Sequence, residues 1–165
     1  MSELFSIYRS TEPAGDIVFV HGLGGDAYDT WGFPDNSCWR QSITISRPDL
    51  NIWSLGYRVD LSEWSAGAMP LSDRAVNILA LLDIRLTEDR PIFFVCHSLG
   101  GLLVKELLRH ALTTTTKYKK LATNVKLVVF FATPHNGSAV ADLAMYLGFF
   151  LRNSVEAVRC YGRTR

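Results

Sequence analysis

Short apolar runs alternate along this chain with longer segments whose apolar positions recur at helical spacing. The short runs are bounded by turn residues and predict buried strands over 16–21, 50–57, 90–97 and 125–133. Helical spacing predicts helices over 71–86, 99–111 and, around Trp39, 35–46. Ser72 is the expected N-cap of the first of these helices. Strands apolar on both faces that alternate with helices are typical of an α/β fold with a mostly parallel sheet.

The size of the chain fits one domain. Its 165 residues are 48% hydrophobic, which is enough to bury a core. We expect a single domain over residues 1–165, with 1–14 and 152–165 as peripheral tails. The segment 58–70 is the main irregular connection and is expected to border a pocket.

Composition and charge exclude several classes of function. The net charge is +1 without a large basic block, so no nucleic-acid partner is expected. Cys38, Cys96 and Cys160 lack metal-ligand spacing, and their odd number favours a reducing compartment. The N-terminus does not resemble a signal peptide, and the apolar segment 139–151 is shorter than the roughly 20 residues that span a bilayer. We therefore expect a cytoplasmic protein without metal or cofactor, in which 139–151 is a buried helix or contacts a membrane surface.

The stretch "FFVCHSLGGLLVKELL" places Ser98 between a predicted strand and a predicted helix. On such a turn a serine side chain projects at the carboxyl edge of the sheet, and the amide after it points at a developing oxyanion. This turn demands small residues near the serine, and Gly100 and Gly101 supply them. Cys96 stands where the usual G-x-S-x-G pattern has its first glycine. The pattern predicts Ser98 as a nucleophile and the Leu99 amide as an oxyanion donor; a plain N-cap serine is the alternative.

The stretch "VFVHGLGGDAYDTW" follows another predicted strand and contains His21 and Gly22. Its glycines let the backbone turn amides inward, so the Leu23 amide is the expected second oxyanion donor. A phosphate-binding loop is the alternative, but position 27 is Ala, so G-x-G-x-x-G is not met. His21 is expected to brace this loop.

These two stretches and "ATPHNGS", in this order, resemble the α/β-hydrolase fold, and more narrowly the lipase-like serine hydrolases of the SERAC/PGAP1/DUF676 type. The resemblance covers roughly residues 15–150, and cysteine before His97 is a variant associated with this group. It implies a three-layer α/β sandwich and a serine ester hydrolase acting on an ester or lipid, with Ser98 as nucleophile and the Leu23 and Leu99 amides as the oxyanion hole. Similar domains also stand within larger multidomain proteins.

The general base is the missing component. In this fold the order is Ser, then Asp or Glu, then His. His97 adjoins the nucleophile and is expected to point away from it, whereas His110 lies about 18 Å along the helix at 1.5 Å per residue. His135 follows the fourth predicted strand and is the best candidate base, with loop bracing as its alternative role; Asp142 is expected on a helix surface.

Two hypotheses about function remain open. Only one further strand is predicted after Ser98, so we expect the domain to lack its last strands and turnover to be weak. The first hypothesis is a serine ester hydrolase whose base comes from His135, a partner chain or further sequence. The second is a non-catalytic fragment or pseudoenzyme that acts as an interaction module, self-associating through the apolar 139–151 segment. Aromatic residues either line an acyl pocket or pack in the core: Trp31, Phe33, Trp53, Tyr57 and Trp64.

Overall fold

The computed structural model describes residues 2–33, 38–58, 70–113 and 116–135. The chain divides into two compact units, Met1–Thr133 and Pro134–Arg165. Pro134 and His135 are the described residues of the second unit, so the fold given below is that of the first. The predicted segments 139–151 and 152–165, and positions 59–69 of the predicted connection, lie outside the described residues.

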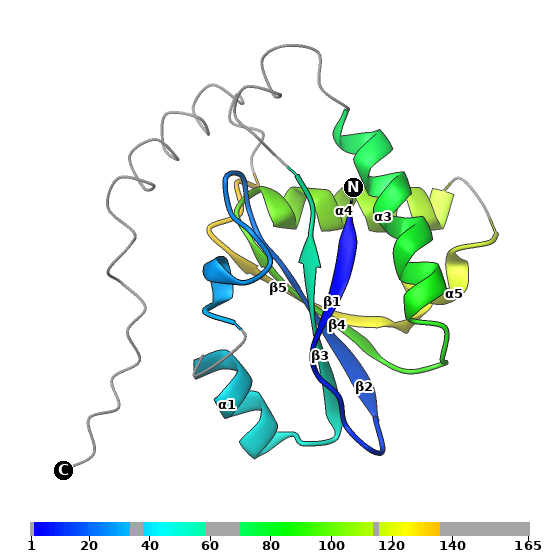
Figure 1. The fold of residues 1–165 in the computed structure, drawn as a ribbon. Helices are drawn as coiled ribbons and strands as arrows, with labels where there is room; N and C mark the ends of the chain where they lie inside the picture. The colour runs from blue at the N-terminus through cyan, green and yellow to red at the C-terminus, as the bar shows by residue number, and fades with distance from the viewer. Residues whose placement is uncertain (1, 34–37, 59–69, 114–115, 136–165) are drawn as a thin grey trace. The chain divides into compact units, whose positions relative to one another are not determined.

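A five-stranded sheet in the order β1-β3-β2-β4-β5 forms the centre of the first unit (Figure 1). Its strands are β1 (Glu3–Tyr8), β2 (Gly15–Val20), β3 (Leu50–Gly56), β4 (Ile92–His97) and β5 (Val125–Phe131). The last four are mutually parallel, and β1 pairs antiparallel with β3 at one edge. The predicted α/β fold with a mostly parallel sheet is confirmed.

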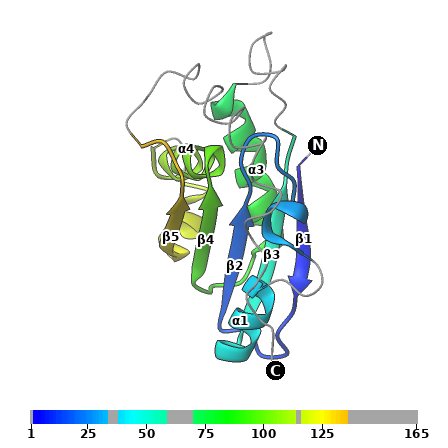
Figure 2. The same cartoon turned by 90° about the vertical axis from the view of Figure 1, so that its left-hand side faces the viewer.

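Helices cover both faces of the sheet (Figure 2). The helix α1 (Cys38–Ser46) lies on one face, while α3 (Leu71–Arg85) and α4 (Leu99–Thr113) pack together on the other. This division follows from right-handed crossovers that run in opposite directions, from β2 to β3 on one side of β2 and from β3 to β4 on the other. The chain adds two short helices, η1 (Asp29–Trp31) and α5 (Lys119–Asn124). None of the helices in the described part of the chain is long and apolar enough to cross a membrane.

An aromatic cluster fills the face that α1 covers. Phe19 of β2 lies at its centre, with ring centroids 4.9 Å from Trp31, 5.2 Å from Phe33 and 5.9 Å from Trp39. Trp31, Phe33, Trp53 and Tyr57 are all at most 6% exposed. These four aromatic residues are therefore part of the core, and Trp64 lies outside the described residues.

The four predicted strands and three predicted helices are all present, with ends shifted by a few residues. Three details of the prediction are wrong. Residues 3–8 form the edge strand β1, although 1–14 were expected to be a peripheral tail. Helix α3 begins at Leu71 after Pro70, so Ser72 lies inside its first turn and is not the N-cap. Helix α5 lies between the helix predicted over 99–111 and the strand predicted over 125–133, where no element was predicted.

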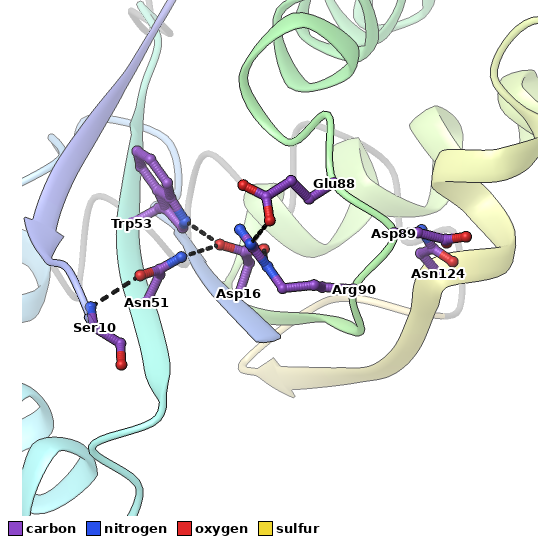
Figure 3. A network of polar contacts seen from close by, with 8 residues as sticks. All are labelled: Ser10, Asp16, Asn51, Trp53, Glu88, Asp89, Arg90 and Asn124. Carbon is purple, nitrogen blue, oxygen red and sulfur yellow. Dashed lines mark hydrogen bonds and ion pairs between the residues drawn. The ribbon is translucent and has the colours of Figure 1, made fainter. Parts of the chain in front are cut away.

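A buried polar network ties the amino ends of the parallel strands together (Figure 3). The carboxylate of Asp16, 2% exposed, accepts hydrogen bonds of 2.8 Å from both Asn51 Nδ2 and Trp53 Nε1. Its other oxygen lies 3.3 Å from Arg90 Nε, just before β4. Buried charges are tolerated when they are paired and hydrogen-bonded, as here. The network lies at the opposite edge of the sheet from Ser98.

Candidate active site

Two loops meet at the carboxyl ends of the neighbouring strands β2 and β4. The chain leaves β2 for β3 on one side and later returns to β4 on the other, so the strand order changes direction between them. Ligands of open α/β sheets bind outside the carboxyl ends of the strands at such a point. The His21–Gly25 loop follows β2 and Ser98 follows β4, so both predicted halves of the site lie there.

Ser98 occupies a strained turn between β4 and α4. Its φ is 50°, in the left-handed region that residues with a side chain rarely adopt. The residue is 3% exposed. Such strain persists only when the surroundings enforce it, and it is concentrated at functional sites. A serine serving only as a helix N-cap would have extended backbone, so this φ does not fit the N-cap alternative.

Close backbone contacts place the His21–Gly25 loop against this turn. A Cβ added to Gly22 would lie 2.9 Å from Cβ of Ser98, so the loop backbone passes directly beside Ser98. A Cβ added to Gly100 would lie 2.6 Å from the carbonyl oxygen of Val20. The start of α4 can therefore approach the end of β2 because residue 100 has no side chain.

The loop itself turns at Leu23. The N–H of Gly25 donates to the carbonyl of Gly22 at 3.2 Å, and Gly24 has φ 68°, as the third position of such a turn requires. Leu23 is 5% exposed. The turn beside Ser98 thus carries the predicted second oxyanion donor.

His21 braces this loop with both ring nitrogens. Nδ1 lies 2.8 Å from the carbonyl oxygen of Gly22, and Nε2 lies 3.4 Å from the backbone N–H of Tyr57. Because a carbonyl only accepts and an amide only donates, the proton must reside on Nδ1. The Tyr57 ring stacks on the imidazole at 4.4 Å, and its hydroxyl donates to the His21 carbonyl at 2.6 Å. Burial lowers the pKa of His21 and favours the neutral ring.

His97 lies on the α1 face of the sheet, next to Ser98 in sequence. Its ring meets Trp31 edge-on at 6.5 Å, and burial lowers the pKa of His97. Among the residues that the structure describes, no hydrogen bond joins the Ser98 hydroxyl to His97 or His21. His110 lies in the last turn of α4, remote from the turn that opens this helix.

Cys96 fills the place of the first glycine of the usual pattern. It is fully buried, and burial raises the pKa of its thiol to about 12. The thiol therefore stays protonated at neutral pH, and cysteine serves here as a compact apolar residue.

The end of β5 holds the turn at Ser98 through hydrogen bonds. The N–H of Ser98 donates to the carbonyl of Phe131 at 2.8 Å, and the Thr133 hydroxyl donates to the carbonyl of Ser98 at 3.1 Å. Between them Ala132 has φ 49°. Neither this clamp nor the His21–Tyr57 stack was predicted from the sequence. The only signal for the clamp was a polar residue, Thr133, at the end of the last predicted strand.

His135 belongs to the second unit, which is described separately from the site above. It remains the predicted base, and Asp142 lies outside the described residues. Within the described ranges no group of three or more His, Cys, Asp or Glu side chains is placed to hold a metal ion.

Comparison with known proteins identifies relatives over nearly the whole chain. A family model described as "Putative serine esterase (DUF676)" matches residues 13–163. "Protein SERAC1" of Bos taurus is 31% identical over 171 residues, which covers 90% of this chain and 26% of that protein. The chain thus spans about a quarter of the length of this curated relative.

Solved structures share the fold at low sequence identity. A carboxylesterase structure of the thaumarchaeon Nitrososphaera gargenis has a TM-score of 0.54 at 12% identity, covering 99% of this chain and 58% of that one. The type II thioesterase BorB of the borrelidin biosynthetic cluster has a TM-score of 0.53 at 14% identity, covering 94% and 60%. These similarities show an α/β-hydrolase fold.

Proposed function

Because this chain belongs to the serine esterase family DUF676, we propose that it is a serine ester hydrolase with Ser98 as its nucleophile. The observation that carries the proposal is the left-handed backbone of Ser98 at the junction of β4 and α4. No helix cap or packing role requires that conformation, whereas a nucleophile turn does.

The proposed reaction is acyl transfer through the serine. Oγ of Ser98 bonds to the acyl carbon while a base takes its proton, and the carbonyl oxygen becomes an oxyanion. The N–H groups of Leu23 and Leu99 donate to that oxygen. The intermediate collapses to an acyl-serine, and the proton goes to the departing alcohol. Water then releases the carboxylic acid and restores the serine.

His135 is the base that we propose within this chain. His21 is occupied by Gly22 and Tyr57, and His110 lies at the far end of α4. His135→Ala should abolish ester turnover if the imidazole is the base. His135→Asn removes the base but keeps a polar side chain that can brace the loop. If His135 is the base, both variants should lose turnover; if it only braces the loop, His135→Asn should keep it.

A fluorophosphonate probe tests the nucleophile directly. We expect the purified chain to gain one probe mass, and Ser98→Ala to gain none. Ser42→Ala, on an exposed position of α1, is the matched control and should label like the wild type. A chain that melts cooperatively but takes no probe would contradict the proposal and favour the non-catalytic interaction module.

A further inference from the structure

We propose that Thr133 is a positioning residue that aims the oxyanion-hole amide of Leu99. This inference rests on the proposed function, since it concerns the same site. It is carried by the hydrogen bond of 3.1 Å from Thr133 Oγ1 to the carbonyl oxygen of Ser98.

The orientation of one peptide unit decides where the Leu99 amide points. The carbonyl of Ser98 and the N–H of Leu99 belong to the same planar trans peptide, in which they point in opposite directions. A group that holds the carbonyl therefore also fixes the direction of the N–H. As the first residue of α4, Leu99 has no intrahelical acceptor for its N–H, which leaves it available to an oxyanion.

This peptide unit needs holding because it can turn about ψ of Ser98, which would move the Ser98 carbonyl and the Leu99 N–H together. With φ at 50°, Ser98 lies in a sparsely populated region and keeps that conformation only while its surroundings enforce it, so rotation about ψ has to be opposed. Two donors oppose that rotation by using both lone pairs of the Ser98 carbonyl. One is the N–H of Gly101 at 3.1 Å, and the other is the Thr133 hydroxyl.

The end of β5 is shaped to deliver this hydroxyl. The carbonyl of Phe131 accepts from the Ser98 N–H at 2.8 Å, and Ala132 with φ 49° turns the chain so that Thr133 also faces Ser98. Gly101 makes room for it, because an added Cβ there would lie 2.7 Å from Cγ2 of Thr133. Both backbone polar groups of the nucleophile are thus held by residues 131–133.

The same bond also makes the Leu99 amide a better donor. A hydrogen bond accepted by a carbonyl polarises its peptide group, and linked hydrogen bonds strengthen one another. Loss of a whole oxyanion donor lowers rates about 10²–10³-fold, so a misdirected donor should cost part of that range.

The test compares variants that differ by one hydroxyl. The second-order rate of fluorophosphonate labelling should fall about tenfold or more in Thr133→Val and return to within about threefold of wild type in Thr133→Ser. With an ester substrate, kcat should fall while KM changes little, which a merely structural role would not produce. If Thr133→Val does not fold, Thr133→Ala against Thr133→Ser makes the same comparison without added bulk.

Thr44→Val is the matched control, because Thr44 Oγ1 donates to the carbonyl of Arg40 at 2.8 Å in α1, on the other face of the sheet. It should label at the wild-type rate. Equal labelling rates in the variants with and without the hydroxyl at position 133 would overturn the inference while leaving Ser98 as nucleophile. A wild-type chain that takes no label at Ser98 would instead refute the proposed function.

Discussion

Ser98 and Ala132 have positive φ without being glycine, and Ala132 lies between the two residues, Phe131 and Thr133, that hydrogen-bond the backbone of Ser98. The chain tolerates these two conformations because the hydrogen bonds between the turn and the end of β5 link them. Strain of this kind raises the free energy of the folded chain locally and is concentrated at functional sites. The free-energy cost of this strain can be measured by substitutions at Ser98.

Replacing Ser98 by glycine should relieve that strain. A left-handed residue with a Cβ costs roughly 1–2 kcal/mol more than glycine, partly offset by the greater freedom of glycine in the unfolded chain. We therefore expect Ser98→Gly to be about 1 kcal/mol more stable than Ser98→Ala in urea unfolding, although both lose probe labelling. Equal stability would mean that the turn stores no strain at this residue.

His21 should make stability depend on pH below neutrality. Burial lowers the pKa of His21 in the folded chain, whereas an unfolded histidine titrates near 6.5. As the pH falls through that value the unfolded chain binds a proton that the folded chain refuses, so the free energy of unfolding decreases. The free energy of unfolding should therefore be larger at pH 7.5 than at pH 5.5.

The variant His21→Gln isolates this contribution, because its side chain can still reach a backbone partner but does not titrate. It should be less stable than wild type at pH 7.5 and show a shallower loss of stability between pH 7.5 and 5.5. An unchanged slope in urea unfolding would assign the pH dependence to other groups, with His97, whose pKa burial also lowers, as the first to examine.

At the scale of elements, the Asp16 network holds three parallel strands in register. Asp16→Ala would leave Trp53 Nε1 and Asn51 Nδ2 buried without their acceptor and would remove the partner of Arg90. Because Arg90 is 15% exposed, water compensates part of the loss, and we expect destabilisation of about 2–4 kcal/mol. Asp16→Asn retains one acceptor and should lose less.

The pair Arg47–Asp49 provides the contrast. It is an exposed ion pair of 2.8 Å between neighbouring loop residues. Exposed pairs contribute little, so Asp49→Asn should leave the urea midpoint nearly unchanged. A similar effect of the Asp16 and Asp49 variants would show that the buried network is not needed to hold the strands.

The elements that could be predicted from the sequence are those with an unbroken apolar run or a clear helical period. The strand β2 reads as a continuous apolar run because it is buried on both faces. The edge strand β1 has a burial pattern broken by a bulge near Ile7, so its period is not readable. The cap of α3 was missed because Pro70 starts that helix without a side-chain hydrogen bond.

For the whole molecule, the sequence predicted that the segments after the strands 16–21 and 90–97 lie near each other, because parallel strands bring their carboxyl ends to one edge. Gly22 and Ser98 follow two such strands and meet there. The clamp from Thr133 could not be predicted, since it depends on β5 pairing next to β4 and on the positive φ of Ala132. Neither the pairing partner nor that backbone angle is encoded in a local pattern.

The antiparallel strand β1 forms the edge of the sheet beside β3, and it contacts both the sheet and helix α3. Leu4 is 2% exposed, and its carbonyl accepts from Arg85 at the end of α3. Just after β1, the N–H of Ser10 donates to the side-chain oxygen of Asn51, a member of the Asp16 network, at 3.0 Å. A peripheral tail would make none of these contacts.

Deleting residues 2–9 should therefore destabilise the chain substantially. Exposing the surface that Leu4 buries costs about 2 kcal/mol by itself, and β3 would lose its antiparallel partner. We expect a melting temperature lower by several degrees and faster cleavage of the shortened chain by trypsin. Leu4→Ala should reproduce much of the loss, whereas Ser6→Ala, at an exposed position of the same strand, should not. Because β1 lies at the edge remote from Ser98, folded molecules of the shortened chain should still take the fluorophosphonate probe at Ser98.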